Sequence, residues 1–127
     1  MIAENGGHGA NCPANATVQN CLLVQNALDG IIVGSGSLVT GNRVLGFINV
    51  TNANAAIRVI ASNNRIENNH IANYPNGIVV PNGGNLIVRN STANVVTNYV
   101  IGFGNTFGPT NIVPGVATNH PWANFSF

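Results

Sequence analysis

Charged residues are scarce in this chain of 127 residues. They make up 6% of the sequence and leave a net charge of +1, whereas soluble domains usually carry about 25%. Lysine is absent, so all four basic residues are arginine. A nucleic-acid-binding surface needs clustered basic side chains. The sequence therefore excludes nucleic acid as a partner.

Carboxylates are also few, being limited to Glu4, Asp29 and Glu67. Chemistry that needs paired acids or a carboxylate-lined calcium site has almost nothing to draw on. His8, His70 and His120 lack metal-ligand spacing with cysteine or carboxylate. We expect no metal and no cofactor.

Long apolar runs are missing as well. No segment approaches the ~20 apolar residues of a membrane span, and the N-terminal residues lack the pattern of an export signal. We expect no membrane partner. The two cysteines, Cys12 and Cys21, lie nine residues apart. They are compatible with a disulfide in an oxidising compartment and equally with two free thiols.

The abundant residues are turn formers and β formers, with 24 Asn, 15 Gly, 15 Val and 12 Ile. Four units repeat along the chain at spacings of 21, 27 and 22 residues. The extra residues of the longer unit, 49–55, are interpreted as a loop insertion. The first parts of the units begin at Val18, Val39, Ile66 and Val88, and the second parts occupy 30–33, 56–59, 77–80 and 99–102.

A period near 22 with short β segments and Asn or Gly corners is typical of a coiled β-solenoid. We therefore predict an all-β fold, a right-handed parallel β-helix of about four to five short coils with a C-terminal capping tail. The right-handed winding follows from the strong preference of parallel crossovers. A single domain spans 1–127, with an N-terminal edge at 1–16, repeat coils at 17–102 and a cap at 103–127. The cap contains the aromatic residues Phe103, Phe107, Trp122, Phe125 and Phe127.

Alternation along each unit assigns side chains to the inside or the outside. In the first parts, the apolar residues at both ends point inward, and those after the corner are Leu23, Val44, Ile71 and Ala93. The corner itself carries a predicted inward ladder of Asn20, Gly41, Asn68 and Asn90. An inward asparagine can hydrogen-bond to its equivalents above and below. Outside, we expect a surface ion pair between Glu67 and Arg89, and Arg43 stacked below His70.

In the second parts, Ile31, Ile57, Ile78 and Val100 are predicted to point inward. The outward residues are then Ile32, Arg58, Val79 and Ile101. A solvated sheet face should be polar, so these four residues are predicted to form an oligomer interface of a homodimer or homotrimer. Arg58 would there pair with a backbone carbonyl or with Asp29 of a neighbour. Coverage by the aromatic C-terminal tail is the competing interpretation.

Four segments carry a family resemblance: NRIENNHI (64–71), GNLIVRNSTAN (84–94), GNTFGP (104–109) and HPWANFSF (120–127). Together they make the C-terminal two thirds of the chain resemble bacterial right-handed parallel β-helix repeat proteins. The resemblance implies a pectate-lyase-like fold and a secreted or cell-surface location. Pectate-lyase-like enzymes use acidic calcium ligands beside a basic residue, and no acidic cluster accompanies Arg58. Lyase chemistry of that kind is therefore not carried over.

Two functions from different classes remain open. The leading hypothesis is a non-catalytic, self-associating β-helix module that binds glycan on its polar faces, with a polysaccharide as partner. The alternative is a carbohydrate-active enzyme, a polysaccharide lyase or hydrolase, whose site forms between subunits from Glu67, Arg43, Arg58 and His70. A third interpretation is a truncated gene product with no selected activity.

Overall fold

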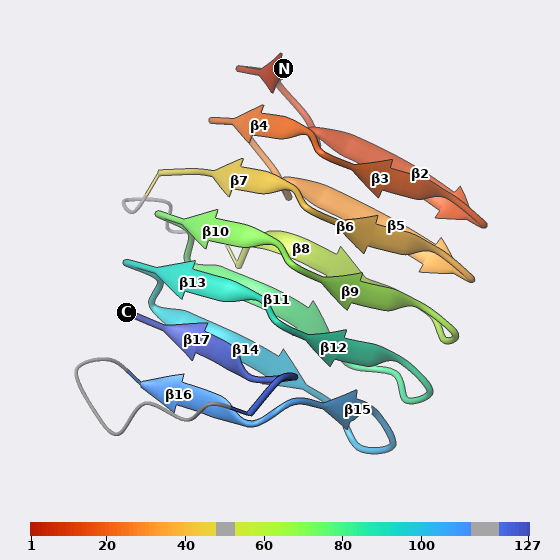
Figure 1. Cartoon of the computed structure of the whole chain (residues 1–127). Coiled ribbons are helices and arrows are strands. Elements are labelled where there is room, and N and C mark those ends of the chain that lie inside the picture. The colour runs from red at the N-terminus through yellow and green to blue at the C-terminus, as the bar shows by residue number, and fades with distance from the viewer. Residues whose placement is uncertain (48–52, 113–119) are drawn as a thin grey trace.

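The computed structural model describes residues 1–47, 53–112 and 120–127. Within these ranges the chain forms strands, turns and bends, and no helix there is long and apolar enough to cross a membrane. The strands build three parallel sheets, through which the chain passes in turn (Figure 1). We call one circuit of the chain through the three sheets a pass, and the strands of each pass pair in register with those of the next. This architecture confirms the all-β prediction and is consistent with a parallel β-helix.

The three sheets are named A, B and C. Sheet B contains, in spatial order, β2 (Ala10–Ala14), β5 (Ile31–Ser35), β8 (Ala55–Val59), β11 (Asn76–Val80) and β14 (Thr97–Ile101). Sheet C contains β3 (Thr17–Gln19), β6 (Leu38–Thr40), β9 (Arg65–Glu67), β12 (Leu86–Val88) and β15 (Thr106–Phe107). Sheet A contains β1 (Ile2–Ala3), β4 (Leu22–Val24), β7 (Arg43–Leu45), β10 (His70–Ala72), β13 (Ser91–Ala93), β17 (Asn124–Ser126) and β16 (Thr110–Ile112).

Two of these strands lie in the predicted N-terminal edge. β1 and β2 continue sheets A and B through residues 1–16, for which the sequence predicts no strand pattern beyond a short edge. The predicted loop insertion at 49–55 lies largely outside the described residues, and β8 begins at its last residue, Ala55.

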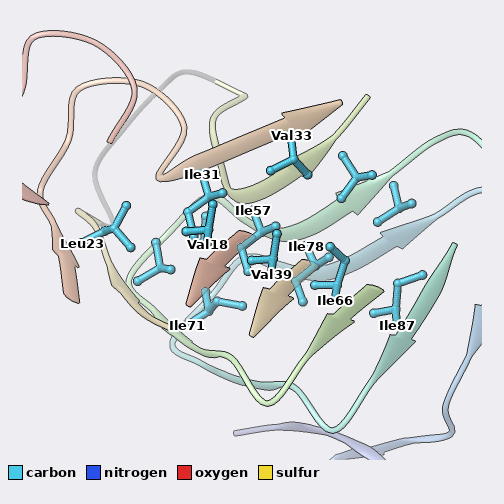
Figure 2. Close-up of a cluster of buried hydrophobic side chains, with 14 of the residues drawn as sticks. Val18, Leu23, Ile31, Val33, Val39, Ile57, Ile66, Ile71, Ile78 and Ile87 are labelled. Carbon is cyan, nitrogen blue, oxygen red and sulfur yellow. The ribbon is translucent and has the colours of Figure 1, made fainter. Parts of the chain in front are cut away.

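Apolar side chains from the three sheets meet in the interior (Figure 2). β-branched residues favour extended backbone, and their alternation along each short strand turns one face inward. Equivalent residues of successive passes lie next to one another, so the interior is built from rows. Except for Val18 at 7% exposure, the rows are completely buried, and they comprise Val18, Val39, Ile66 and Ile87 from sheet C, Leu23, Val44 and Ile71 from sheet A, and Ile31, Ile57, Ile78, Val33, Val59 and Val80 from sheet B.

The fourth repeat unit differs from the sequence prediction by one residue. Ile66 pairs with Ile87 rather than with Val88, and Ile71 pairs with Thr92 rather than with Ala93. A one-residue slip exchanges the two faces of a strand, so the buried residues here include the polar Thr92. Its hydroxyl donates to the Phe125 carbonyl at 3.2 Å. Because that hydrogen bond satisfies the hydroxyl, a polar residue is tolerated where an apolar one was expected.

Each corner between sheets C and A places one residue in the left-handed region. Asn20, Gly41, Asn68 and Arg89 occupy equivalent corner positions with φ between 52° and 65°. Asparagine and glycine tolerate this conformation best. At this corner the next residue along the chain turns its side chain inward, while the corner side chain itself is exposed.

The inward residues at this corner form an asparagine ladder of Asn42, Asn69, Asn90 and Asn124, all buried. The backbone N–H of Asn42 donates to Asn69 Oδ1 at 3.0 Å, and that of Asn69 donates to Asn90 Oδ1 at 3.1 Å. The side-chain amide of Asn69 also donates to Asn90 Oδ1 and to the Val39 carbonyl. The ladder exists, but the predicted positions Asn20, Gly41 and Asn68 are wrong by one residue, and only Asn90 belongs to it.

A second ladder follows the corner between sheets B and C. The backbone N–H groups of Ser37, Asn64 and Asn85 donate to the side chains of Asn64, Asn85 and Asn105, at 2.7, 2.9 and 3.0 Å. Two corners of each pass are therefore tied together along the stack by buried amides. The abundance of asparagine in the sequence has its physical explanation here.

The C-terminal strand lies out of chain order. β17 is inserted between β13 and β16, so the chain skips one position in sheet A and later fills it with its own end (Figure 1). Asn124 of β17 accepts the Asn90 backbone N–H at 3.0 Å and thereby extends the ladder.

The predicted aromatic cap is formed only in part. The Phe107 ring lies 5.3 Å from that of Tyr99, and both pack against the hydrophobic interior. Phe103 is fully exposed and Phe127 is 60% exposed, so neither covers the end of the interior. Residues 113–119 of the predicted cap lie outside the described residues.

The ladder yields a direct stability prediction. Asn69→Ala removes the oxygen that accepts from both the backbone N–H and the side-chain amide of Asn42. It also leaves the Val39 carbonyl without its side-chain donor. We expect the free energy of unfolding to fall by about 3 kcal/mol, because buried polar groups lose their partners. Urea denaturation monitored by circular dichroism measures this.

The matched control is the neighbouring Asn68→Gly. Glycine already occupies the equivalent corner at Gly41, with φ 65°, so stability should change by less than about 0.5 kcal/mol. Equal losses at the two positions would contradict the assignment of Asn69 as the inward residue.

Candidate functional site

The outer face of sheet B carries a row of four side chains, three of them apolar, that crosses four strands. Ile32 pairs with Arg58, Arg58 with Val79, and Val79 with Val100. We call these four residues the outer row. Val100 is 41% exposed, and Ile60, which follows β8, adds a side chain that is 52% exposed.

The outer row contains three of the four predicted interface residues, and the fourth is corrected. Ile101 pairs with Val80 and packs against the hydrophobic interior. Val100 takes the outward position instead. The cause is the one-residue shift in the last unit: Tyr99 occupies the inward position beside Ile78. Its hydroxyl lies 3.0 and 2.9 Å from the carbonyl oxygens of Asn90 and Phe125, which share its single proton as acceptors.

Arg58 is the charged member of the outer row, and its partner is a carboxylate of the same chain. Arg58 Nε donates to Asp29 Oδ2 at 2.8 Å, and Nη2 donates to Asp29 Oδ1 at 3.1 Å and to the Ala53 carbonyl at 2.8 Å. The Asp29 side chain is only 6% exposed. Within one chain the guanidinium therefore already holds both partner types, a carbonyl and Asp29, that were expected of a neighbour. The outer row presents no unbalanced charge.

Asp29, which lies just before β5 of sheet B, is also the centre of a cluster of polar groups. The Ala55 backbone N–H donates to Asp29 Oδ1 at 2.6 Å, and His8 Nδ1 lies 3.6 Å from Asp29 Oδ2. The Tyr74 hydroxyl is buried nearby and has no hydrogen-bond partner among the described residues. Burial raises the pKa of Tyr74 to about 12, and the negative charge of Asp29 adds to the rise. A buried tyrosine of this kind stays neutral at physiological pH.

The four residues of the alternative enzyme hypothesis lie on three different sheets. Arg43 and His70 are neighbours on sheet A, as predicted, whereas Glu67 is on sheet C and Arg58 on sheet B. His70 Nδ1 lies 2.9 Å from the Ser91 hydroxyl. One chain therefore does not gather these side chains around a single bond.

The predicted ion pair between Glu67 and Arg89 is wrong. Glu67 Oε2 accepts from Arg65 Nη2 at 2.8 Å, because alternate residues of one strand share a face. The hydrogen bond from Arg65 lowers the pKa of Glu67. A catalytic acid needs a raised pKa, so Glu67 is poorly suited to protonate a leaving group.

Other reactive groups are dispersed in the part of the chain that the structure describes. There, no three His, Cys, Asp or Glu side chains lie close enough together to hold a metal ion. Cys12 and Cys21 are both free thiols. Cys12 of β2 pairs with Val33 of the neighbouring strand β5, and Cys21 lies at the corner before β4.

Comparisons of the chain with known protein families, with curated proteins and with solved structures find no match.

The buried tyrosine gives a pH prediction. Above the ordinary tyrosine pKa of about 10 the unfolded chain loses the Tyr74 proton, while the folded chain keeps it up to about pH 12. The stability that Tyr74 contributes is complete below pH 10 and falls as the pH rises from there. Tyr74→Phe should reduce this alkaline loss by about 1.4 kcal/mol per pH unit between pH 10 and 12. It should leave the stability at pH 7 unchanged or slightly higher.

Tyr99→Phe is the matched control. Burial raises the pKa of Tyr99 as well, but its hydroxyl has two carbonyl partners, so Tyr99→Phe should cost about 1–2 kcal/mol at pH 7. Urea melts at pH 7 separate the two variants. Melts up to pH 11.5 measure the alkaline slope, which both substitutions should reduce because burial raises the pKa of both tyrosines. An unchanged alkaline slope in Tyr74→Phe would disprove the buried, unpartnered hydroxyl.

Proposed function

We propose that this protein is a non-catalytic structural module that self-associates through the outer face of sheet B. The outer row carries the proposal, because three of its four positions, Ile32, Val79 and Val100, are apolar. The fourth, Arg58, lies between Ile32 and Val79. The exposed face of a β-sheet is normally polar. A second copy that packs its own outer row against this one removes both from water.

The electrostatics of the outer row favour a second copy over a charged partner. Arg58 is held by Asp29 through two hydrogen bonds and by the Ala53 carbonyl through a third. Since the positive charge is balanced within each chain, two identical faces meet without mutual repulsion. Packed sheets lie about 10 Å apart, a distance that side chains of the size of isoleucine and valine fill.

The composition supports the same proposal. With 6% charged residues, the chain has little surface charge to keep an exposed apolar face in solution. Closed symmetry is the usual result when one face is self-complementary. A dimer with two-fold symmetry meets that condition most simply.

The proposal includes a right-handed winding and kinship with right-handed parallel β-helix repeat proteins. Parallel crossovers are right-handed in nearly all known cases. The segment NRIENNHI supports the kinship, since it supplies one asparagine to each ladder, Asn64 and Asn69.

The self-association is tested by charge insertion. Ile32→Lys/Val79→Lys places two positive charges on the outer row, and burying unpaired charges is prohibitive. Light scattering after size exclusion should show an oligomer for the wild type and a monomer for this double variant. Circular dichroism should show the same strand content in both.

Thr17→Lys/Gln19→Lys is the matched control, because it adds the same charge to exposed positions of sheet C. It should remain an oligomer. A monomeric wild type at tens of micromolar, or an oligomer that survives the two lysines on sheet B, would exclude the outer row as the interface.

A further inference from the structure

A cavity of about 370 Å³ lies on a different face of the molecule, over the outer side of sheet C near its C-terminal end. Leu86 and Val88 of β12 line it from the sheet, and His120 and Trp122 line it from the C-terminal segment. The last pass contributes Thr106, Phe107, Gly108 and Pro109. The lining is mainly apolar. The cavity is separate from the outer row, which lies on sheet B.

The outer face of sheet C changes from charged to apolar between β9 and β12, where the cavity begins. At equivalent positions, β9 presents the ion pair of Arg65 and Glu67, whereas β12 presents Leu86 and Val88. Val88 is only 2% exposed although it points away from the interior rows. The C-terminal segment therefore shelters an apolar patch that the rest of sheet C lacks.

Trp122 is held in place by the chain around it. The Arg89 guanidinium carbon lies 4.4 Å from the centre of the indole ring, and Arg89 Nε donates to the Pro121 carbonyl at 2.8 Å. The Trp122 backbone N–H donates to His120 Nδ1 at 3.2 Å. Cation–π contact and hydrogen bonds fix the indole while 42% of Trp122 remains exposed. A rigid, half-exposed aromatic wall is suited to receive a flat ring.

We infer that this cavity binds a small bicyclic aromatic compound of the indole or naphthalene class. An apolar protein cavity of about 150 Å³ accommodates a single benzene ring. The cavity beside Trp122, at about 370 Å³, is more than twice as large, which fits two fused rings. It also lies within the usual range of small-molecule sites, about 300–1,000 Å³.

The lining argues against a saccharide of the same size. Three of the eight lining residues, Thr106, His120 and Trp122, carry a hydrogen-bonding side-chain group. The other five carry none, and they are Leu86, Val88, Phe107, Gly108 and Pro109. Sugar hydroxyls buried against them would lose their water partners without replacement. A fused aromatic ring loses little on leaving water and gains contact with the Trp122 indole.

The single tryptophan of the chain makes the test specific. A ¹H–¹⁵N spectrum of the labelled full chain has one indole cross-peak, which belongs to Trp122. Titration with unlabelled indole should shift this peak in a saturable manner, together with the backbone amides of Thr106 and Gly108. Methyl β-glucoside over the same concentrations should leave all three peaks in place.

Leu86→Phe fills the cavity and should weaken indole binding by roughly tenfold or more. Leu38→Phe is the matched control at the same register position of sheet C, two strands away, and should bind as the wild type does. If Leu86→Phe does not fold, Trp122→Ala provides the second variant, in which the indole-induced shifts of Thr106 and Gly108 should disappear.

Three results would overturn the inference. They are a shift that grows linearly without saturation, equal binding by the wild type and a folded Leu86→Phe or Trp122→Ala variant, and saturable binding of the glucoside in place of indole. Binding that is unaffected by Ile32→Lys/Val79→Lys would support a site independent of the proposed self-association face.

Discussion

The buried amides at the corners are the constraint on which the structure depends. Every pass through three sheets must turn sharply, and each turn brings backbone N–H groups into the interior, where water cannot reach them. Asn42, Asn69 and Asn90 meet this need because each side-chain oxygen accepts from the pass before it. The same contact fixes the register, since a slip of one residue would remove the acceptor. With the register fixed, the isoleucine and valine side chains of successive passes align in apolar rows beside the ladder.

The C-terminal strand follows from the same requirement. The Asn90 amide needs an acceptor above it, and the chain supplies Asn124 from a strand that enters sheet A out of order. β17 also provides the Phe125 carbonyl to the hydroxyls of Thr92 and Tyr99. The last interior positions are therefore polar and satisfied, unlike the purely apolar rows below them. The segment leading into β17 in turn places Trp122 over sheet C, which creates the cavity.

Much of the fold could be predicted from the sequence, because composition and period report directly on β structure and stacking. The interior rows of Val39, Ile66 and Ile57 were evident from alternation alone. The sequence predicts the ladder one residue too early at Asn68. In an Asn-Asn pair such as Asn68 and Asn69, composition does not tell which side chain points inward. The fourth unit was misaligned because Thr92 and Tyr99 take interior positions through hydrogen bonds from a strand far along the chain. For the same reason Val100, rather than Ile101, completes the outer row, and Arg89 meets Trp122 rather than Glu67.

Hydrogen exchange of the side-chain amides tests the central role of the ladder most directly. The Asn69 amide donates to Asn90 and to the Val39 carbonyl and is buried, whereas the Asn68 side chain is exposed. The account predicts that the Asn42, Asn69 and Asn90 side-chain amides exchange only when the whole domain unfolds, while that of Asn68 exchanges as freely as in a peptide. Exchange of the Asn69 amide as fast as that of Asn68, under conditions where the strand amides stay protected, would contradict it.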